Sequence, residues 1–248
     1  MSCLISCSTR FANDYGQAFA APTSPSTLLA STPVTLREQP VYAYIVTTIK
    51  TTNYQLVQNG SAPNFDGRRI TLCTCKHKDR ATFRPVKDQD DPWKNVWVAG
   101  LTSKTADPSR SLAYLMCVER SFLNQRELWR YLPNDCRRAK SASKSERGDL
   151  FEPKATAANA PHNPTNYYSP IYGHVHSTKE HPNKWHHDVM RWGRWSKEHR
   201  LLLGQATQSY RWMNIKMILN PNAIGVSAHH RIYDSLNEFI ADLQKFAP

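Results

Sequence analysis

The sequence predicts an α+β domain in which a mostly antiparallel sheet is flanked by peripheral helices. Short segments rich in aromatic and β-branched residues recur along the chain, beginning with Val41 to Val46. A run near the C-terminus instead carries apolar residues at helical spacing. The chain has no Gly-x-Gly-x-x-Gly, Walker loop or Gly-x-Ser-x-Gly motif, which argues against nucleotide-driven and serine-hydrolase functions.

The first 40 residues differ in composition from the rest. They are rich in Ser, Thr, Ala and Pro without a sustained period, and we expect a poorly ordered N-terminal arm over residues 1–40. A single domain is then expected over residues 41–248, because a chain of this length can bury one core of ordinary size. Strands are expected at residues 41–46, 70–75, 96–101, 112–118 and 201–206, with a further candidate at 213–219.

Two helices are expected. Asn124 to Leu132 is amphipathic and is followed by Pro133, which ends a helix. Near the C-terminus a helical face is predicted to cover the sheet, and it consists of Ile232, Leu236, Phe239, Ile240, Leu243 and Phe246. Residues 155–170 contain three prolines and are expected to form a loop.

Composition points to a polyanionic partner. Thirty-two Lys and Arg against 20 Asp and Glu give a formal charge of +12. This excess favours nucleic acid over an anionic membrane surface, although cations can also serve solubility alone. The six cysteines form no Cys-x-x-Cys pair, as expected of a reduced cytoplasmic protein without a zinc ribbon. The chain has no apolar run of the ~20 residues that span a bilayer, and no secretory signal is recognised.

Residues 60–80 are the most informative stretch. Gly60 and Gly67 favour turns, an extended segment follows, and cations come at its end. Lys76, Lys78 and Arg80 could contact phosphates, or they could be solvated cations at a strand end. Cys75 could be a thiolate beside Lys76 or a small core residue.

This stretch resembles the second type of nucleotide-modification-associated domain. The matching residues are Gly60, Ala62, Pro63, Asn64, Gly67, Thr71, Leu72, Cys75, Lys76 and Arg80. Weaker similarity extends over residues 41–215 and includes Arg147-Gly148-Asp149, whereas Asn59 and His77 depart from the family pattern. The resemblance implies a role in DNA hypermodification or phage defence. It also implies nucleotide or phosphate binding by Asn64, Thr71, Cys75, Lys76, Arg80, Arg147 and Asp149.

The expected order of strands and helices is also similar to PUA-like folds, such as the EVE and ASCH domains. Such domains hold an extruded base or nucleotide at the mouth of a small β-barrel or curled sheet. The similarity implies a base pocket in this chain. Tyr167, Tyr168 and Tyr172 could line that pocket or fill the core.

Histidines gather in residues 174–188. His174 and His176 would project to one side of a strand, with Asp188 a few residues later. These three residues are candidates for acid/base catalysis. A bound metal and a solvated histidine-rich surface are the alternatives, but no known metal-site spacing is matched, so no metal or other cofactor is assigned.

Two basic segments accompany the histidines. Trp185 and Trp192 are interleaved with cations and could stack on unpaired bases, or they could pack inward from an amphipathic helix. The second segment is expected to be a nucleic-acid arm or a solvated loop, and it contains Arg137, Arg138, Lys140, Lys144 and Arg147.

Three functions follow from these patterns. The first is recognition of a modified or flipped nucleobase, in DNA more readily than in RNA, or of a free nucleotide. The second is an enzyme of base modification, a transferase or a hydrolase of the glycosylase kind, that uses the histidine cluster. The third is a structural interaction protein, with proteins of a modification or defence operon as partners.

Overall fold

The computed structural model describes residues 24–47, 49–52, 55–58, 63–74, 76–83, 90–102, 110–141, 150–168, 186–190, 199–212, 218–219 and 230–244. The chain divides into two compact units, and each is built from separate stretches of sequence. Unit 1 comprises residues 1–58, 95–117 and 207–248, and unit 2 comprises residues 59–94 and 118–206. Two long strands, β6 (Arg110–Phe122) and β7 (Leu201–Arg211), run from one unit into the other.

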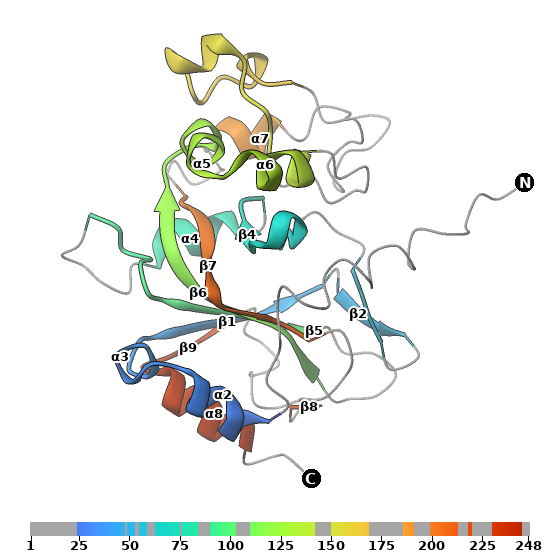
Figure 1. Cartoon of the computed structure of the whole chain (residues 1–248), viewed down its shortest axis with the longest axis vertical. Helices are drawn as coiled ribbons and strands as arrows, with labels where there is room; N and C mark the ends of the chain where they lie inside the picture. The colour runs from blue at the N-terminus through green and yellow to red at the C-terminus, as the bar shows by residue number, and fades with distance from the viewer. Residues whose placement is uncertain are drawn as a thin grey trace, which may run out of the picture. The chain divides into compact units, whose positions relative to one another are not determined.

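Unit 1 contains a mixed sheet in the strand order β7-β6-β5-β1-β9, with β8 paired to β6 and a separate β2-β3 hairpin. Its β1 pairs with β5 in parallel and with β9 in antiparallel register. Helices α2 and α8 lie side by side on one face of this sheet (Figure 1). Besides β6 and β7, the described elements are α2 (Pro25–Ser31), α3 (Val34–Arg37), β1 (Val41–Val46), β2 (Ile49–Thr52), β3 (Gln55–Gln58), β5 (Trp97–Thr102), β8 (Ile218–Leu219), β9 (His230–Tyr233) and α8 (Leu236–Gln244).

Alternation along the strands assigns the two faces of this sheet. Val41 and Ala43 of β1 point to the face that packs against Leu28 of α2 and Phe239 of α8. All four side chains are buried, at 1% exposure or less. The helices are therefore held on the sheet by apolar packing.

The other face of the unit 1 sheet is aromatic. Tyr44 of β1 and Tyr114 of β6 are both buried, and their hydroxyl oxygens are 2.7 Å apart in a hydrogen bond. Gly100 of β5 makes room for this pair, because a Cβ atom at Gly100 would lie 2.0 Å from Cε1 of Tyr114. Glycine at this position is required by close packing and not by backbone conformation.

Unit 2 combines the β4-β7-β6 portion of the sheet with short helices (Figure 1). Its apolar core includes Phe122, Leu128, Leu132, Leu201 and Leu203. Besides β6 and β7, the described elements are η1 (Asp66–Arg68), β4 (Thr71–Leu72), α4 (His77–Thr82), α5 (Gln125–Tyr131), α6 (Asn134–Ser141), η2 (Ala155–Ala158), η3 (Pro164–Asn166) and α7 (His186–Met190).

The α+β class and most expected elements are confirmed. The strands predicted at residues 41–46, 112–118 and 201–206 lie within β1, β6 and β7, although β6 and β7 extend beyond them. The strand predicted at residues 96–101 is β5, shifted by one residue to Trp97–Thr102. The predicted helix at 124–132 is α5, and Asn124 caps it as expected of a polar residue at that position. Antiparallel pairing is interrupted by the parallel β1-β5 pair, so the sheet is mixed.

Three expectations differ from the structure. Residues 25–37, placed in the poorly ordered arm, form α2 and α3, because Leu28 is buried in the unit 1 core. Ile232 belongs to β9 and is 43% exposed, so the C-terminal helix begins only at Leu236. Residues 137–141 of the expected basic arm belong to the helix α6 (Asn134–Ser141), and Lys140 within it is buried.

In the described part of the chain, no helix is both long enough and apolar enough to cross a membrane.

Gly100→Ala tests the packing of the aromatic face of unit 1. The added methyl would meet Tyr114 at 2.0 and 2.4 Å and Val46 at 2.9 Å. Overpacking of this kind is expected to lower the free energy of unfolding by about 3 kcal/mol, measured by urea denaturation.

A double mutant provides the control. In the Tyr114→Ala background the clash with the ring is removed, so Gly100→Ala should cost much less than it does in the wild type. An equal cost in both backgrounds would contradict the packing explanation.

Candidate functional site

Only part of the predicted site lies among the described residues. Asn64, Thr71, Lys76 and Arg80 are described, and all four belong to unit 2. Asp188 lies in α7, but its side chain is outside the description. The remaining predicted site residues lie outside the described residues and stay predictions; they are Cys75, Arg147, Asp149, His174, His176, Trp185 and Trp192.

Asn64 organises the turn of the 60–80 stretch. Its backbone N–H and C=O both pair with Thr71 at 2.9 Å, and its Oδ1 accepts a hydrogen bond from the N–H of Asp66 at 2.8 Å. Asn64 and Thr71 are buried, with exposures of 1% and 0%. Asn64 and Thr71 are two of the seven residues that the resemblance assigned to nucleotide or phosphate binding. In the structure they are buried in unit 2 and stabilise the turn by hydrogen bonds.

Gly67 brings helix α6 close to this turn. Its φ of +69° lies in the left-handed region, which an L side chain rarely adopts. A Cβ atom at Gly67 would also lie 2.7 Å from Cα and 2.9 Å from the carbonyl oxygen of Cys136 in α6. Burial raises the pKa of the Cys136 thiol, so this sulfur stays protonated at neutral pH and serves packing.

Lys140 joins α6 to the turn through its side chain. Its Nζ donates to the Asn64 carbonyl and Oδ1, both at 3.2 Å, to the Arg69 carbonyl at 2.7 Å and to Thr71 Oγ1 at 3.1 Å. The side chain is fully buried. A buried ammonium is tolerated only where it is hydrogen-bonded, and these oxygens provide that environment.

Two of the cations assigned to phosphate binding, Lys76 and Arg80, are engaged within unit 2. Arg80 is 1% exposed, and its guanidinium donates to the carbonyl oxygens of Cys73, at 2.6 Å, and of Arg200. Lys76 has a left-handed backbone at the start of α4, and its Nζ lies 3.6 Å from Asp79 Oδ2. The strand predicted over residues 70–75 is confined to Thr71–Leu72 in the structure. Phosphate binding by Lys76 and Arg80 stays a prediction.

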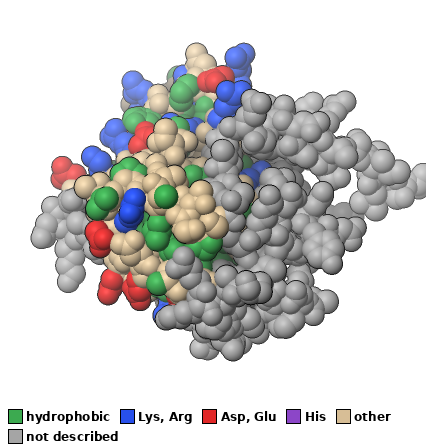
Figure 2. All heavy atoms as spheres, turned by 60° about the horizontal axis from the view of Figure 1, so that its bottom comes forward, with side chains coloured by type: hydrophobic (Ala, Val, Ile, Leu, Met, Phe, Trp, Pro, Cys, Tyr) green, Lys and Arg blue, Asp and Glu red, His purple; other side chains and the backbone are tan. Residues whose placement is uncertain are grey.

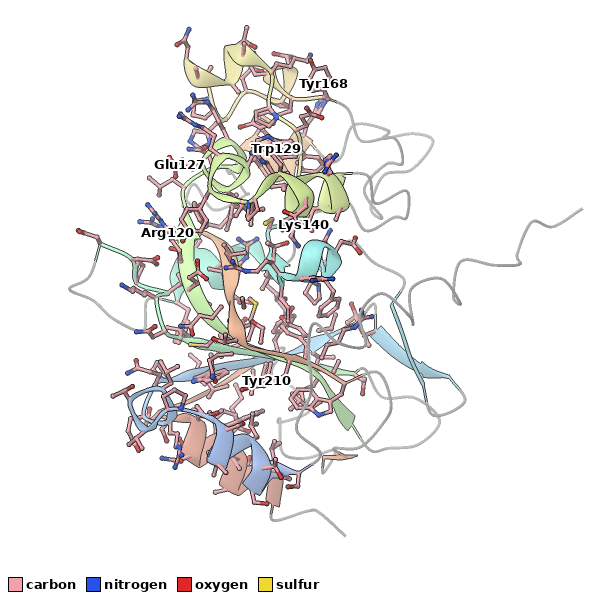
Figure 3. All side chains as sticks on the ribbon, in the orientation of Figure 1. Arg120, Glu127, Trp129, Lys140, Tyr168 and Tyr210 are labelled. Atoms are coloured by element: carbon pink, nitrogen blue, oxygen red, sulfur yellow. The ribbon has the colours of Figure 1, made fainter. Side chains whose placement is uncertain are left out.

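A different set of side chains in unit 2 is open to solvent. Tyr131 at the end of α5 is 43% exposed, and Arg120 of β6 lies 5.3 Å from the centre of its ring. Tyr168, after η3, is 55% exposed and has Lys154 Nζ at 5.6 Å. Trp129 of α5 is half-buried and has the Arg137 guanidinium at 5.9 Å (Figure 3). Each of these three aromatic rings therefore has a Lys or Arg side chain close enough to its centre for a cation–π interaction.

Two of these rings, Trp129 and Tyr131, belong to helix α5, which is stabilised by a cap and by a buried leucine. Asn124 Oδ1 accepts from the N–H of Glu127 at 2.9 Å, which caps the helix, and Glu127 Oε2 accepts from the N–H of Leu123 just before the cap at 3.1 Å. Leu128 is fully buried and anchors the helix in the apolar core of unit 2.

The segment carrying Lys154 and Tyr168 packs against the same helix. The N–H of Phe151 donates to Gln125 Oε1 of α5 at 3.4 Å. Tyr167 is buried, its hydroxyl donates to the Pro161 carbonyl at 2.6 Å, and burial raises its pKa to about 12. Tyr167 thus fills the core, whereas the adjacent Tyr168 points outward, as strand-like alternation requires.

Further exposed or half-exposed cations lie on α5 and α6. Figure 2 shows Lys and Arg side chains gathered along the upper left of the described part, with some Asp and Glu among them. We call the exposed and half-buried aromatic and basic residues of β6, α5, α6 and residues 154–168 the aromatic-basic surface of unit 2. It consists of Arg120, Arg126, Trp129, Arg130, Tyr131, Arg137, Arg138, Lys154 and Tyr168.

The sequence contained a pattern that could have revealed this surface. Arg126, Trp129, Arg130 and Tyr131 alternate aromatic rings and cations within one helix. None of these four residues was among the predicted nucleic-acid contacts, because the segment was identified only as an amphipathic helix. Which of its rings are exposed depends on how the helix packs, and no periodicity predicts that.

Among the described residues no group of three or more His, Cys, Asp or Glu side chains is placed to hold a metal ion. No family model, curated protein or solved structure matches this chain. The resemblance of residues 60–80 to the nucleotide-modification-associated domains therefore stays a prediction.

Lys140→Met tests the buried ammonium. The variant keeps a side chain of similar length but removes the donor to Asn64, Arg69 and Thr71. Loss of charged hydrogen bonds to buried oxygens is expected to lower the free energy of unfolding by about 3 kcal/mol in urea denaturation.

The matched control is Lys94→Met, because Lys94 is an exposed lysine of the same unit. Its free energy of unfolding should change by less than about 0.5 kcal/mol. Equal and small effects of the two substitutions would show that the buried ammonium is not needed to hold α6 on the turn.

Proposed function

We propose that this protein binds unpaired nucleic acid through the aromatic-basic surface of unit 2. The observation that carries the proposal is the pairing of three exposed or half-exposed rings with a cation: Tyr131 with Arg120, Trp129 with Arg137, and Tyr168 with Lys154. Aromatic faces stack on bases that are not in a duplex, and neighbouring Lys and Arg side chains hold the backbone.

Charge supports the proposal. The chain carries a formal charge of +12, so a polyanion is attracted to it at long range. The rings give the surface a means of binding that a duplex cannot use, because the faces of its bases are stacked on one another.

Modified or extruded bases in DNA fit this surface as a more specific partner. A flipped or unpaired base offers the free π-face that Tyr131 and Tyr168 can take. The resemblance of residues 60–80 favours a role in DNA hypermodification or phage defence, and a PUA-like arrangement of the strands is part of the same proposal.

Tyr131→Ala and Tyr168→Ala test the stacking rings. Each substitution removes one platform, and base stacking on an aromatic side chain contributes about 1–3 kcal/mol. We expect each variant to bind a short single-stranded oligonucleotide about tenfold more weakly in fluorescence anisotropy.

Ile232→Ala provides the control for these variants. Ile232 is as exposed as Tyr131, at 43%, but it lies in unit 1. Its removal should leave binding unchanged. If the three variants bind alike, the aromatic-basic surface is not the binding site.

Arg126→Gln and Arg130→Gln test the cations of α5. Neutralising a cation that contacts a phosphate lowers the slope of log K against log salt by about 0.7 for a single strand. We expect a shallower slope for each variant and a still shallower one for the double variant. An unchanged slope would mean that these arginines do not contact the backbone.

A further inference from the structure

We propose that Glu119 selects the base that stacks on Tyr131 and that it favours guanine. The inference rests on the proposed function, because it needs a base at Tyr131. It adds a specificity determinant to a surface that would otherwise accept any unpaired base.

The geometry places a fixed carboxylate at the hydroxyl end of an exposed ring. The Tyr131 hydroxyl donates to Glu119 Oε1 at 2.7 Å. The side chain of Glu119 is 30% exposed, so it is partly open to solvent beside the ring. This hydrogen bond, with partial burial, raises the pKa of Tyr131, so the hydroxyl remains a donor at neutral pH.

Arg69 fixes the orientation of the carboxylate. Its Nη2 lies 2.5 Å from Glu119 Oε2, and the same guanidinium donates to the Gly204 carbonyl from Nε and Nη2 at 3.1 and 3.0 Å. Arg69 follows Gly67 in the turn that Lys140 holds through the Arg69 carbonyl. Arg69 is thus a positioning residue that connects the turn to the exposed surface.

A carboxylate in this position discriminates among bases by hydrogen bonding. Each carboxylate oxygen accepts more than one hydrogen bond, so Glu119 retains acceptor capacity beside Tyr131 and Arg69. Guanine presents two neighbouring donors, N1–H and N2–H, which match the two oxygens of a carboxylate. Hydrogen bonds to an ionised acceptor are the stronger kind.

The other bases match less well. Adenine and cytosine each offer one amino group beside a ring-nitrogen acceptor, which a carboxylate repels. Thymine and uracil offer one N–H between two carbonyl oxygens. The expected order of affinity is therefore guanine first, adenine and cytosine next, and thymine or uracil last.

The test compares thymidine oligonucleotides that carry one central guanine, adenine, cytosine or thymine, with binding to the full chain measured by fluorescence anisotropy. A bidentate contact predicts that the guanine oligonucleotide binds about tenfold more tightly than the all-thymine one. Glu119→Gln should abolish this preference, because an amide presents only one acceptor.

Three controls separate selection from folding. Asp135→Asn removes an exposed carboxylate of α6 and should keep the guanine preference. Tyr131→Phe keeps the ring and the carboxylate and should keep it as well. Thermal unfolding of each variant shows whether it remains folded, and a folded Glu119→Gln protein with an intact guanine preference overturns the inference.

The remaining outcomes distinguish the two proposals. Equal affinity of the wild type for the four oligonucleotides, with weaker binding of all four by Tyr131→Ala, overturns base selection and leaves the proposed function standing. Absence of binding to every oligonucleotide overturns both.

Discussion

The buried ammonium of Lys140 is the interaction on which unit 2 depends. It reaches Asn64, Arg69 and Thr71 at once, at 2.7–3.2 Å, and so ties helix α6 to the turn that precedes β4. Without this donor the turn would bury carbonyl oxygens that had lost a hydrogen bond, which is costly in a protein interior. Gly67 allows the necessary approach, because any side chain there would meet the backbone of Cys136.

This internal arrangement has consequences at the surface. Once the turn is fixed, Arg69 can hold Glu119, and Glu119 can hold the hydroxyl of Tyr131. A ring held by its hydroxyl loses less freedom when a base stacks on it, which favours binding. In the proposed function, the described part of the 60–80 stretch stabilises the scaffold, and the exposed rings and cations of α5 and its neighbours are the proposed contacts.

Much of the fold could be predicted from sequence, but little of this surface could. Strand β1 and helix α5 follow from local patterns, namely an uninterrupted aromatic and β-branched run and an amphipathic segment with a following proline. The strand predicted at residues 70–75 is shorter in the structure, where β4 spans Thr71–Leu72 and Lys76, with a left-handed backbone, precedes helix α4. The burial of Lys140 could not be predicted, because it depends on oxygens about 70 residues away in sequence. Charge alone suggests an exposed lysine.

The central claim is that the aromatic-basic surface of unit 2 receives unpaired nucleic acid. Hydrogen–deuterium exchange of the full chain, with and without a short single-stranded oligonucleotide, tests it most directly. The account predicts slower exchange on binding in peptides that cover residues 118–141 and 150–168, with little change in α2 and α8 of unit 1. Slower exchange confined to unit 1, or no change at saturating oligonucleotide, would contradict it.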